Sequence, residues 1–119
     1  MSSTSSKTRK MIQSQPQVDI RKLAVEDRLM VSTKNYIYEI EVVSPKEGLI
    51  RISSNDPRLI KPIVGGYVGG MFDLDDVVSF PWIVAQTLRM RIRFLNGGYL
   101  SEPAVSCKLT GKDYYYDVF

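Results

Sequence analysis

Three arginines at alternate positions are the residues of this sequence best suited to bind a charged group. Arg89, Arg91 and Arg93 belong to the stretch RMRIRF, in which the intervening residues are apolar. Because strand side chains alternate between two faces, the three guanidiniums are predicted to share one face of a strand. Such a row can bind phosphates or carboxylates, or it can serve only to prevent edge-to-edge aggregation of an exposed strand.

Two glycine pairs, Gly65-Gly66 and Gly69-Gly70, raise the question of a phosphate-binding loop. A Walker loop ends in Gly-Lys-Ser/Thr, and a dinucleotide loop needs G-x-G-x-x-G at the start of a helix; neither pattern is present here. Glycines within a β pattern instead mark bulges, bends or a closely packed backbone. We predict that at least two of the four have positive φ or lie at a bulge, without an anion site. A groove free of side chains, in which a partner chain lies, is the alternative.

The composition argues against catalysis. The sequence has no histidine and one cysteine, Cys107, which excludes His-based acid–base catalysis, nucleophile–His pairs and His/Cys metal sites. Asp73, Asp75 and Asp76 form the only acidic cluster. The cluster lacks EF-hand spacing and is predicted to be a solvated turn rather than a weak divalent-cation site. We therefore expect a protein that is not an enzyme and has no metal and no cofactor.

The elements that position these residues are predicted to be short antiparallel strands. Residues 35–43, NYIYEIEVV, alternate as in a half-buried strand. A turn over residues 44–48 then brings Glu41 opposite Arg51. Turn signals recur about every ten residues, which is typical of a β-sandwich or barrel. The expected fold is all-β, a small antiparallel β-barrel or sandwich.

A second hairpin is predicted at Asn96-Gly97, because both central residues of a type I′ turn need positive φ. A two-residue turn at this dipeptide places Arg91 opposite Glu102 and Phe94 near Tyr99.

The C-terminal part carries two further patterns. Val105, Cys107 and Leu109 alternate with other residues and are predicted to share a buried face, with Cys107 as a buried thiol. The aromatic run Tyr114–Phe119 is predicted to pair as a final strand, with a short docking peptide as the alternative.

Positive charge is concentrated near the N-terminus. Residues 1–22 carry five basic residues and one acidic one, whereas the remaining residues carry eleven basic and twelve acidic ones. We predict a flexible, disordered basic arm over residues 1–22, which contains Lys7, Arg9 and Lys10, and a single β domain over residues 23–119. Neither a secretory signal nor an apolar run of membrane-spanning length is found, so a cytoplasmic protein without membrane contact is expected.

Four segments carry a resemblance to known proteins. They are RLMVSTKNYIYEIEV (28–42), VGGYVGGMF (64–72), WIVAQTLRMRIRF (82–94) and SEPAVSCKL (101–109). Together they resemble short, uncharacterised bacterial all-β proteins. The resemblance implies a small barrel-like fold and a bacterial setting, and it implies no activity and no site residue.

These observations lead to one expected function and one alternative. The expected function is a non-catalytic β-barrel binding or assembly module whose partner is another protein or a second copy of the chain. The alternative is RNA or DNA binding through the basic arm and the Arg89/Arg91/Arg93 face. The near-neutral charge of residues 23–119 favours the first, because a nucleic-acid surface over the whole domain would need a basic domain.

Overall fold

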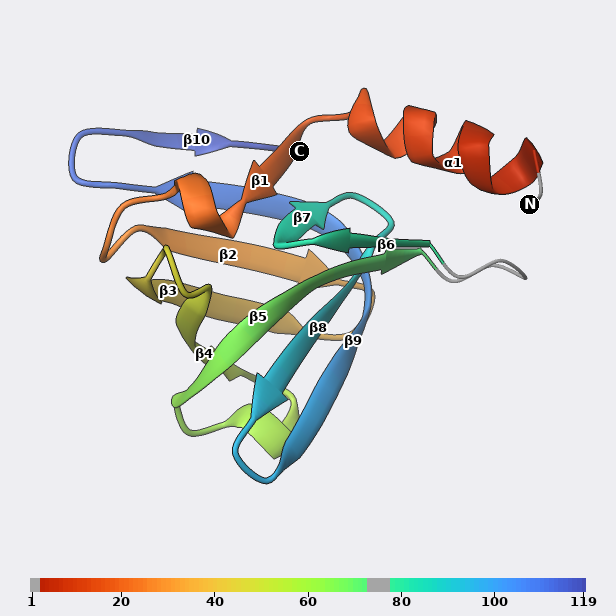
Figure 1. Cartoon of the computed structure of the whole chain (residues 1–119). Helices are drawn as coiled ribbons and strands as arrows, with labels where there is room; N and C mark the ends of the chain where they lie inside the picture. Colours follow the sequence, from red (N-terminus) through yellow and green to blue (C-terminus); the bar gives the residue numbers. More distant parts are fainter. Residues whose placement is uncertain (1–2, 73–77) are drawn as a thin grey trace.

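The protein is a small antiparallel β structure, shown here as a computed structural model that describes residues 3–72 and 78–119 (Figure 1). The predicted all-β class and the antiparallel pairing are confirmed. The elements of the described residues are α1 (Ser3–Gln13), β1 (Gln17–Asp19), the 3-10 helix η1 (Ile20–Lys22), β2 (Arg28–Thr33), β3 (Ile37–Ser44), β4 (Leu49–Ser54), the 3-10 helix η2 (Pro57–Leu59), β5 (Ile63–Phe72), β6 (Val78–Pro81), β7 (Ile83–Ala85), β8 (Arg89–Phe94), β9 (Gly97–Thr110) and β10 (Tyr115–Asp117).

Six of the strands pair in a closed ring. β9 pairs with β2, β2 with β3, β3 with β4, β4 with β5, β5 with β8, and β8 again with β9, each time antiparallel. The ring closes because β9 is 14 residues long, so that its first half pairs with β8 and its second half with β2. β6 and β10 extend this sheet, while β1 and β7 form a separate two-stranded sheet (Figure 1). The result is a barrel-like ring with few open edges.

The interior of the ring is filled by side chains from alternate strand positions. Tyr38, Ile40 and Val42 of β3 are each no more than 1% exposed, as the alternation of this segment predicts. Cys107 is fully buried, as predicted, and burial raises the pKa of its thiol to about 12. A thiol in this state is a packing group rather than a nucleophile.

The N-terminal segment differs from the predicted disordered arm. Residues 3–13 form α1, and β1 pairs with β7. Ile12 is fully buried and packs in a small apolar cluster with Phe80, Ala85 and Leu88. The burial of Ile12 thus helps to hold a polar segment against the β structure, because tertiary contacts stabilise a helix that local propensity alone would not. Neither α1 nor any other helix of the described residues is long and apolar enough to cross a membrane.

The second hairpin turns one residue earlier than predicted. Phe94 pairs with Gly97, so the turn residues are Leu95-Asn96, and Gly97 belongs to β9 with a φ of +146°. The residue directly opposite Tyr99 is Ile92, so Phe94 is a diagonal neighbour of Tyr99 and packs against the core cluster that contains it. The pairings of residues 91–94 move by two residues, which keeps the same side chains on the inner face.

The shift also changes the environment of Arg91. Arg91 lies opposite Leu100, so its predicted pairing with Glu102 is wrong. Glu102 instead accepts hydrogen bonds from the backbone N–H of Asn35, at 3.2 Å, and from its side-chain amide, at 2.6 Å. The carboxylate that was expected to neutralise Arg91 therefore holds the β2–β3 turn.

The C-terminal segment forms the predicted final strand. β10 pairs with the end of β9, and the three tyrosines at residues 114–116 are exposed. The predicted burial of Val105 is wrong, because this side chain is 53% exposed. β2 shifts its register along β9 at this point and pairs with the residues on either side of Val105, so a β-bulge interrupts the alternation.

Candidate functional site

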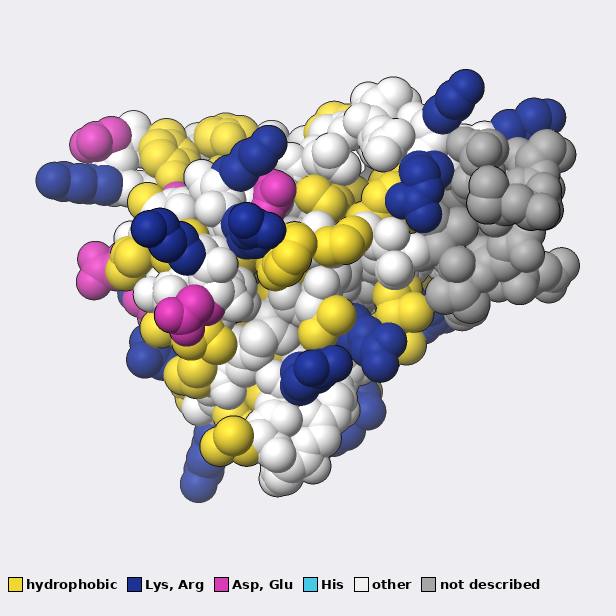
Figure 2. All heavy atoms as spheres, viewed as in Figure 1, with side chains coloured by type: hydrophobic (Ala, Val, Ile, Leu, Met, Phe, Trp, Pro, Cys, Tyr) yellow, Lys and Arg dark blue, Asp and Glu magenta, His cyan; other side chains and the backbone are white. Residues whose placement is uncertain are grey.

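The outer surface of β8 carries the three predicted arginines. Arg91 and Arg93 are exposed and Arg89 is half-buried, while Met90 and Ile92 between them are buried. The alternation predicted from the sequence is therefore confirmed. We call the outer surface of β5, β8 and β9 around these residues the arginine face. Figure 2 shows basic side chains over β8 and along α1 on the same side of the molecule.

Glycines flank the arginines on both neighbouring strands. Arg93 lies between Gly66 of β5 and Gly98 of β9, and Arg91 lies opposite Gly69 of β5. A Cβ atom at Gly66 would meet no atom within 4 Å, so the space above this position is open. The two exposed guanidiniums thus lie beside bare backbone, where an incoming chain can approach closely.

The four glycines of β5 have different structural roles. Only Gly69 has positive φ, +154°, and it lies at the bulge where β5 and β8 shift register, so the prediction of at least two such glycines is wrong. A Cβ atom at Gly65 would lie 2.6 Å from the ring of Phe94, and one at Gly70 would lie 2.5 Å from Leu88. Close packing requires these two glycines. β5 is an extended strand throughout, so all four glycines lie within a strand and not in a phosphate-binding loop.

The charges of Arg91 and Arg93 are not neutralised within the described residues. No carboxylate of residues 3–72 and 78–119 lies within 4.0 Å of either guanidinium. Arg91 Nη1 lies 3.8 Å from Met71 Sδ, and Arg89 Nη1 donates a hydrogen bond to the Ser101 carbonyl at 3.4 Å. Because a guanidinium stays protonated in proteins, the arginine face presents positive charge to solvent.

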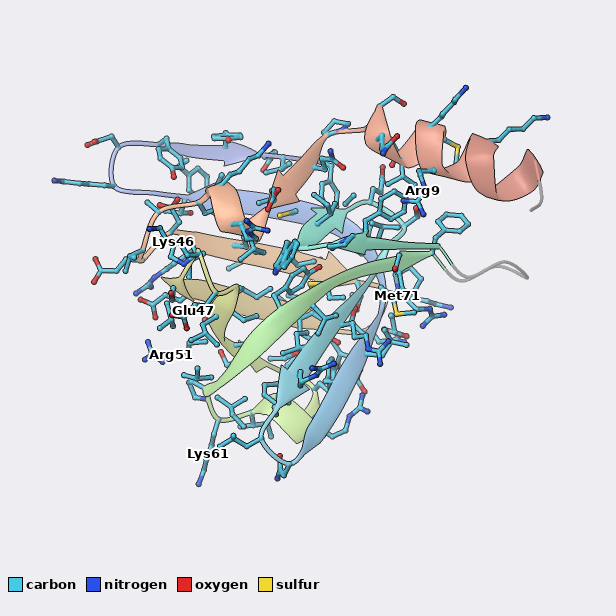
Figure 3. The ribbon with its side chains drawn as sticks, in the orientation of Figure 1. Arg9, Lys46, Glu47, Arg51, Lys61 and Met71 are labelled. Carbon is cyan, nitrogen blue, oxygen red and sulfur yellow. The ribbon has the colours of Figure 1, made fainter. Side chains whose placement is uncertain are left out.

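Helix α1 brings a second group of basic residues towards the same side. Lys7, Arg9 and Lys10 are all exposed. Arg9 Cζ lies 5.1 Å from the centre of the Phe80 ring, a cation–π distance, and Phe80 belongs to β6. β6 pairs with β5, and β5 pairs with β8. Arg9 therefore lies against a strand that is separated from β8 by β5 alone. Figure 3 shows Arg9 on α1 and Met71 near the end of β5.

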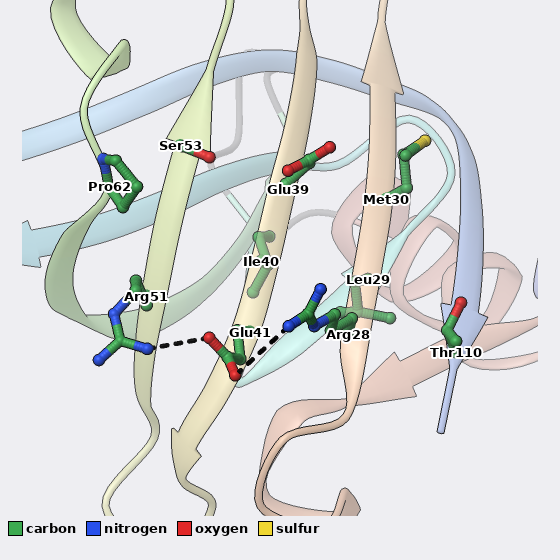
Figure 4. Close-up of a pocket in the computed structure, with 10 residues that line it drawn as sticks. All are labelled: Arg28, Leu29, Met30, Glu39, Ile40, Glu41, Arg51, Ser53, Pro62 and Thr110. Carbon is green, nitrogen blue, oxygen red and sulfur yellow. Dashed lines mark hydrogen bonds and ion pairs between the residues drawn. The ribbon is translucent and has the colours of Figure 1, made fainter. Parts of the chain in front are cut away.

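A different charge pattern lines a groove of about 360 Å³ on β2, β3 and β4 (Figure 4). Glu41 accepts a hydrogen bond from Arg51 at 2.9 Å, which confirms the predicted pairing, and Arg28 lies 4.0 Å from the same carboxylate. Met30 and Pro62 also line the groove. The groove is polar, but its central charges are already paired with one another.

A buried polar network was not anticipated from the sequence. Asp56 is 1% exposed and pairs with Arg58 at 2.7 Å, while the Tyr99 hydroxyl donates to Asp56 and contacts the Tyr38 hydroxyl, each at 2.5 Å. The Arg58 guanidinium, together with the Tyr99 hydroxyl, holds the pKa of Asp56 well below its usual range. Burial and the hydrogen bond to Asp56 raise the pKa of Tyr99. Every member has a partner, so the network is suited to fixing β3, β9 and η2 together rather than to proton transfer.

One sequence signal points to this network. Asp56 precedes Pro57, and an Asp-Pro step commonly starts a short helix, with the Asp side chain capping it. Asp56 does cap η2, since it accepts a hydrogen bond from the backbone N–H of Arg58 at 3.0 Å. The tyrosines that reach Asp56 are too distant from it in the sequence to be assigned to it from the sequence alone.

The described residues contain no group of three or more His, Cys, Asp or Glu side chains that could hold a metal ion. Asp73, Asp75 and Asp76, the acidic cluster of the sequence, lie outside the described residues. No family model, no curated protein and no solved structure matches the chain. The arginine face is therefore identified as the candidate site from its geometry alone.

Proposed function

We propose that the protein is a non-catalytic binding module and that the arginine face contacts an acidic segment of a protein partner. The observation that carries this proposal is the exposure of Arg91 and Arg93 without a carboxylate among the described residues. Two cations held side by side on a rigid barrel strand can bind carboxylates in a fixed arrangement. The absence of histidine and the fully bonded Asp56 network give this role more support than catalysis.

The surroundings of the arginines favour a protein over a nucleic acid. Val64 of β5 and Leu100 of β9 are 44% and 47% exposed, and Leu100 lies directly opposite Arg91. Arginine combined with apolar side chains is characteristic of protein interfaces. Binding of single-stranded nucleic acid uses exposed aromatic rings for base stacking. Among the described residues, the large aromatic side chains that are exposed are the tyrosines at 114–116, on the β9–β10 hairpin.

The setting of this interaction is also part of the proposal. The one cysteine is a buried free thiol, which suits a reducing, cytoplasmic compartment. A second copy of the chain is one form that the protein partner can take. The resemblance to bacterial all-β proteins supports a bacterial host as the source in which to search for it.

A charge-reversal experiment with a matched control tests the proposal. Arg91→Glu with Arg93→Glu lowers the net charge by four, and so does Lys46→Glu with Lys61→Glu, at two exposed lysines away from β8 (Figure 3). The tagged variants are compared in capture of partners from host extract, followed by mass spectrometry. We expect the arginine variant to lose a defined protein partner that the wild type and the lysine variant retain. Equal loss in both variants would mean a non-specific charge effect and would contradict the proposal.

Nucleic acid is tested in parallel. An RNA pool and a DNA pool are titrated at several salt concentrations against the wild type, the arginine variant, and Lys7→Gln with Lys10→Gln, which leaves the buried Ile12 in place. We expect weak binding that declines steeply with salt, because basic side chains of α1 bind any polyanion. Sequence-selective binding that is lost only with the arginine variant would mean that the arginine face binds a nucleic acid and not a protein.

A further inference from the structure

A small hollow lies at the upper end of the arginine face, where β6, β5 and β8 run side by side. Pro81 of β6 pairs with Gly69 of β5, and Gly69 pairs with Arg91 of β8, so these three residues form one row across the sheet. Two residues further along the strands, on the same face, Ser79 pairs with Met71. The hollow has a volume of about 160 Å³ and lies over the middle of these rows.

The glycine at position 69 is necessary for the hollow. A Cβ atom there would lie 2.5 Å from the Phe80 carbonyl oxygen and 3.1 Å from Pro81 Cα, so β6 could not approach β5 as closely. The φ of Gly69, +154°, is also one that side-chain-bearing residues rarely adopt. The bulge between β5 and β8 at this residue bends the strand and shapes the depression. Gly69, from the second glycine pair of the sequence, thus contributes a position without a side chain beside Arg91.

The lining of the hollow combines apolar walls with one guanidinium. Val68, Met71 and Pro81 supply apolar surface, Phe80 borders the hollow while its ring is buried in the cluster around Ile12, and Arg91 is the one charged residue among the described residues that line it. The volume is well below the roughly 300–1,000 Å³ of pockets that enclose a free small-molecule ligand. It suits a single side chain of a larger partner. A group that satisfies both parts of the lining has a short hydrocarbon stem and ends in a carboxylate.

We propose that this hollow is the anchor point of the arginine face and that it takes an acidic side chain, glutamate or aspartate, of the partner protein. The methylene stem packs against Val68 and Pro81, and the carboxylate pairs with Arg91. The Arg9 guanidinium over the Phe80 ring adds positive potential from the α1 side. The inference rests on the proposed function and adds which arginine makes the specific contact. Arg91 binds the carboxylate of the partner. Arg93 lies between Gly66 and Gly98, where the backbone of the partner can come close, and contributes positive charge there.

The inference can be tested without the partner, by titrating the protein with two matched probes. N-acetyl-glutamate N-methylamide carries the carboxylate, and N-acetyl-glutamine N-methylamide has the same shape without the charge. Backbone amide shifts are followed by NMR at low salt. We expect the glutamate probe to shift the amides of Gly69, Met71 and Ser79 along saturable curves, with millimolar affinity, and the glutamine probe to bind at least fivefold more weakly.

Two single variants with the same loss of charge locate the contact. Arg91→Gln is expected to weaken binding of the glutamate probe at least fivefold, and Arg93→Gln is expected to change it less than twofold. The NMR spectrum of each variant serves as the check that the barrel is folded. Equal shifts by both probes, or equal losses in both variants, would overturn the anchor at Arg91. Because that result concerns only the hollow, loss of a protein partner in the double Glu variant would still uphold the broader proposed function.

Discussion

The strands β4 and β8 both carry arginines, but the structure uses them differently. On and after β4, Arg51 pairs with Glu41 at 2.9 Å and Arg58 pairs with the buried Asp56 at 2.7 Å. On β8, Arg91 and Arg93 are exposed and have no carboxylate within 4.0 Å among the described residues. Arg51 and Arg58 are therefore neutralised within the fold, whereas Arg91 and Arg93 carry positive charge that no carboxylate of the described residues neutralises.

This contrast shows that residue type and alternation do not separate the two uses. Arg51 and Arg91 both stand at outward positions of short strands. The difference lies in the neighbouring strand, which presents Glu41 to Arg51 but Gly69 and Leu100 to Arg91. Cross-strand neighbours therefore decide whether an outward cation is neutralised within the sheet.

The largest effect on stability is expected at Asp56. Asp56→Asn removes the charge that holds Arg58 and weakens the hydrogen bond from Tyr99, and should lower the free energy of unfolding by about 2–4 kcal/mol. Urea denaturation at pH 7 measures the difference, with Arg51→Gln on β4 as a surface control. A loss below about 1 kcal/mol would mean that the buried pair does not hold the fold together.

The pH dependence of this difference has a definite sign. The folded pKa of Asp56 lies below its unfolded value, so the contribution of Asp56 to stability is complete above about pH 4 and is lost as the pH falls towards the folded pKa. The stability gap between the wild type and Asp56→Asn should therefore narrow below about pH 4. A gap that stays constant from pH 7 to pH 2 would contradict the assigned pKa shift.

A smaller effect is expected at Glu41, on the outer face. Glu41→Gln removes a carboxylate shared by Arg28 and Arg51, and should lower the free energy of unfolding by about 0.5–1 kcal/mol because the pairs are largely solvent-exposed. The loss should shrink in 0.5 M salt. A double-mutant cycle with Arg51→Gln isolates the pair, and a coupling energy of zero would remove the contrast between Arg51 and Arg91.

The smallest effect is expected on β8. Arg91→Gln with Arg93→Gln should change the free energy of unfolding by no more than about 0.5 kcal/mol in either direction, because the variant breaks no ion pair among the described residues. Thermal and urea unfolding measure this, with Glu41→Gln as the comparison. A loss as large as that of Asp56→Asn would show that the β8 arginines also stabilise the fold.

Local patterns could be predicted from the sequence where one strand or one short loop decides the outcome. The alternation of residues 35–43 and of RMRIRF gave the correct inner and outer faces, and the turn at 44–48 gave the pairing of Glu41 with Arg51. The three arginines were correctly placed on one face for the same reason. Each of these results depends on the period of a strand and on one short connection.

Features that depend on tertiary contacts could not be predicted in this way. Helix α1 depends on the burial of Ile12, which two apolar residues, Met11 and Ile12, in a polar segment do not reveal. The turn at Leu95-Asn96 displaces the stronger turn signal of Asn96-Gly97, and the bulge at Val105 interrupts an alternation that the sequence continues. The hollow over Gly69 needs three strands in register, and strand register across a ring is not encoded in any one segment.

The closure of the ring by β9 also sets the order of events while the chain is being made. Arg28 at the start of β2 pairs with Thr110 at the end of β9. During synthesis on the ribosome, β2 is therefore made long before the strand with which it pairs. Until β9 emerges, β2 and β8 are the strands whose β9-facing edges lack a partner. The arginines of β8 then lie on an open edge, where repulsion between like charges on neighbouring nascent chains opposes aggregation. By this reasoning, the three arginines that face solvent in the folded protein also oppose edge-to-edge association of chains that still lack β9.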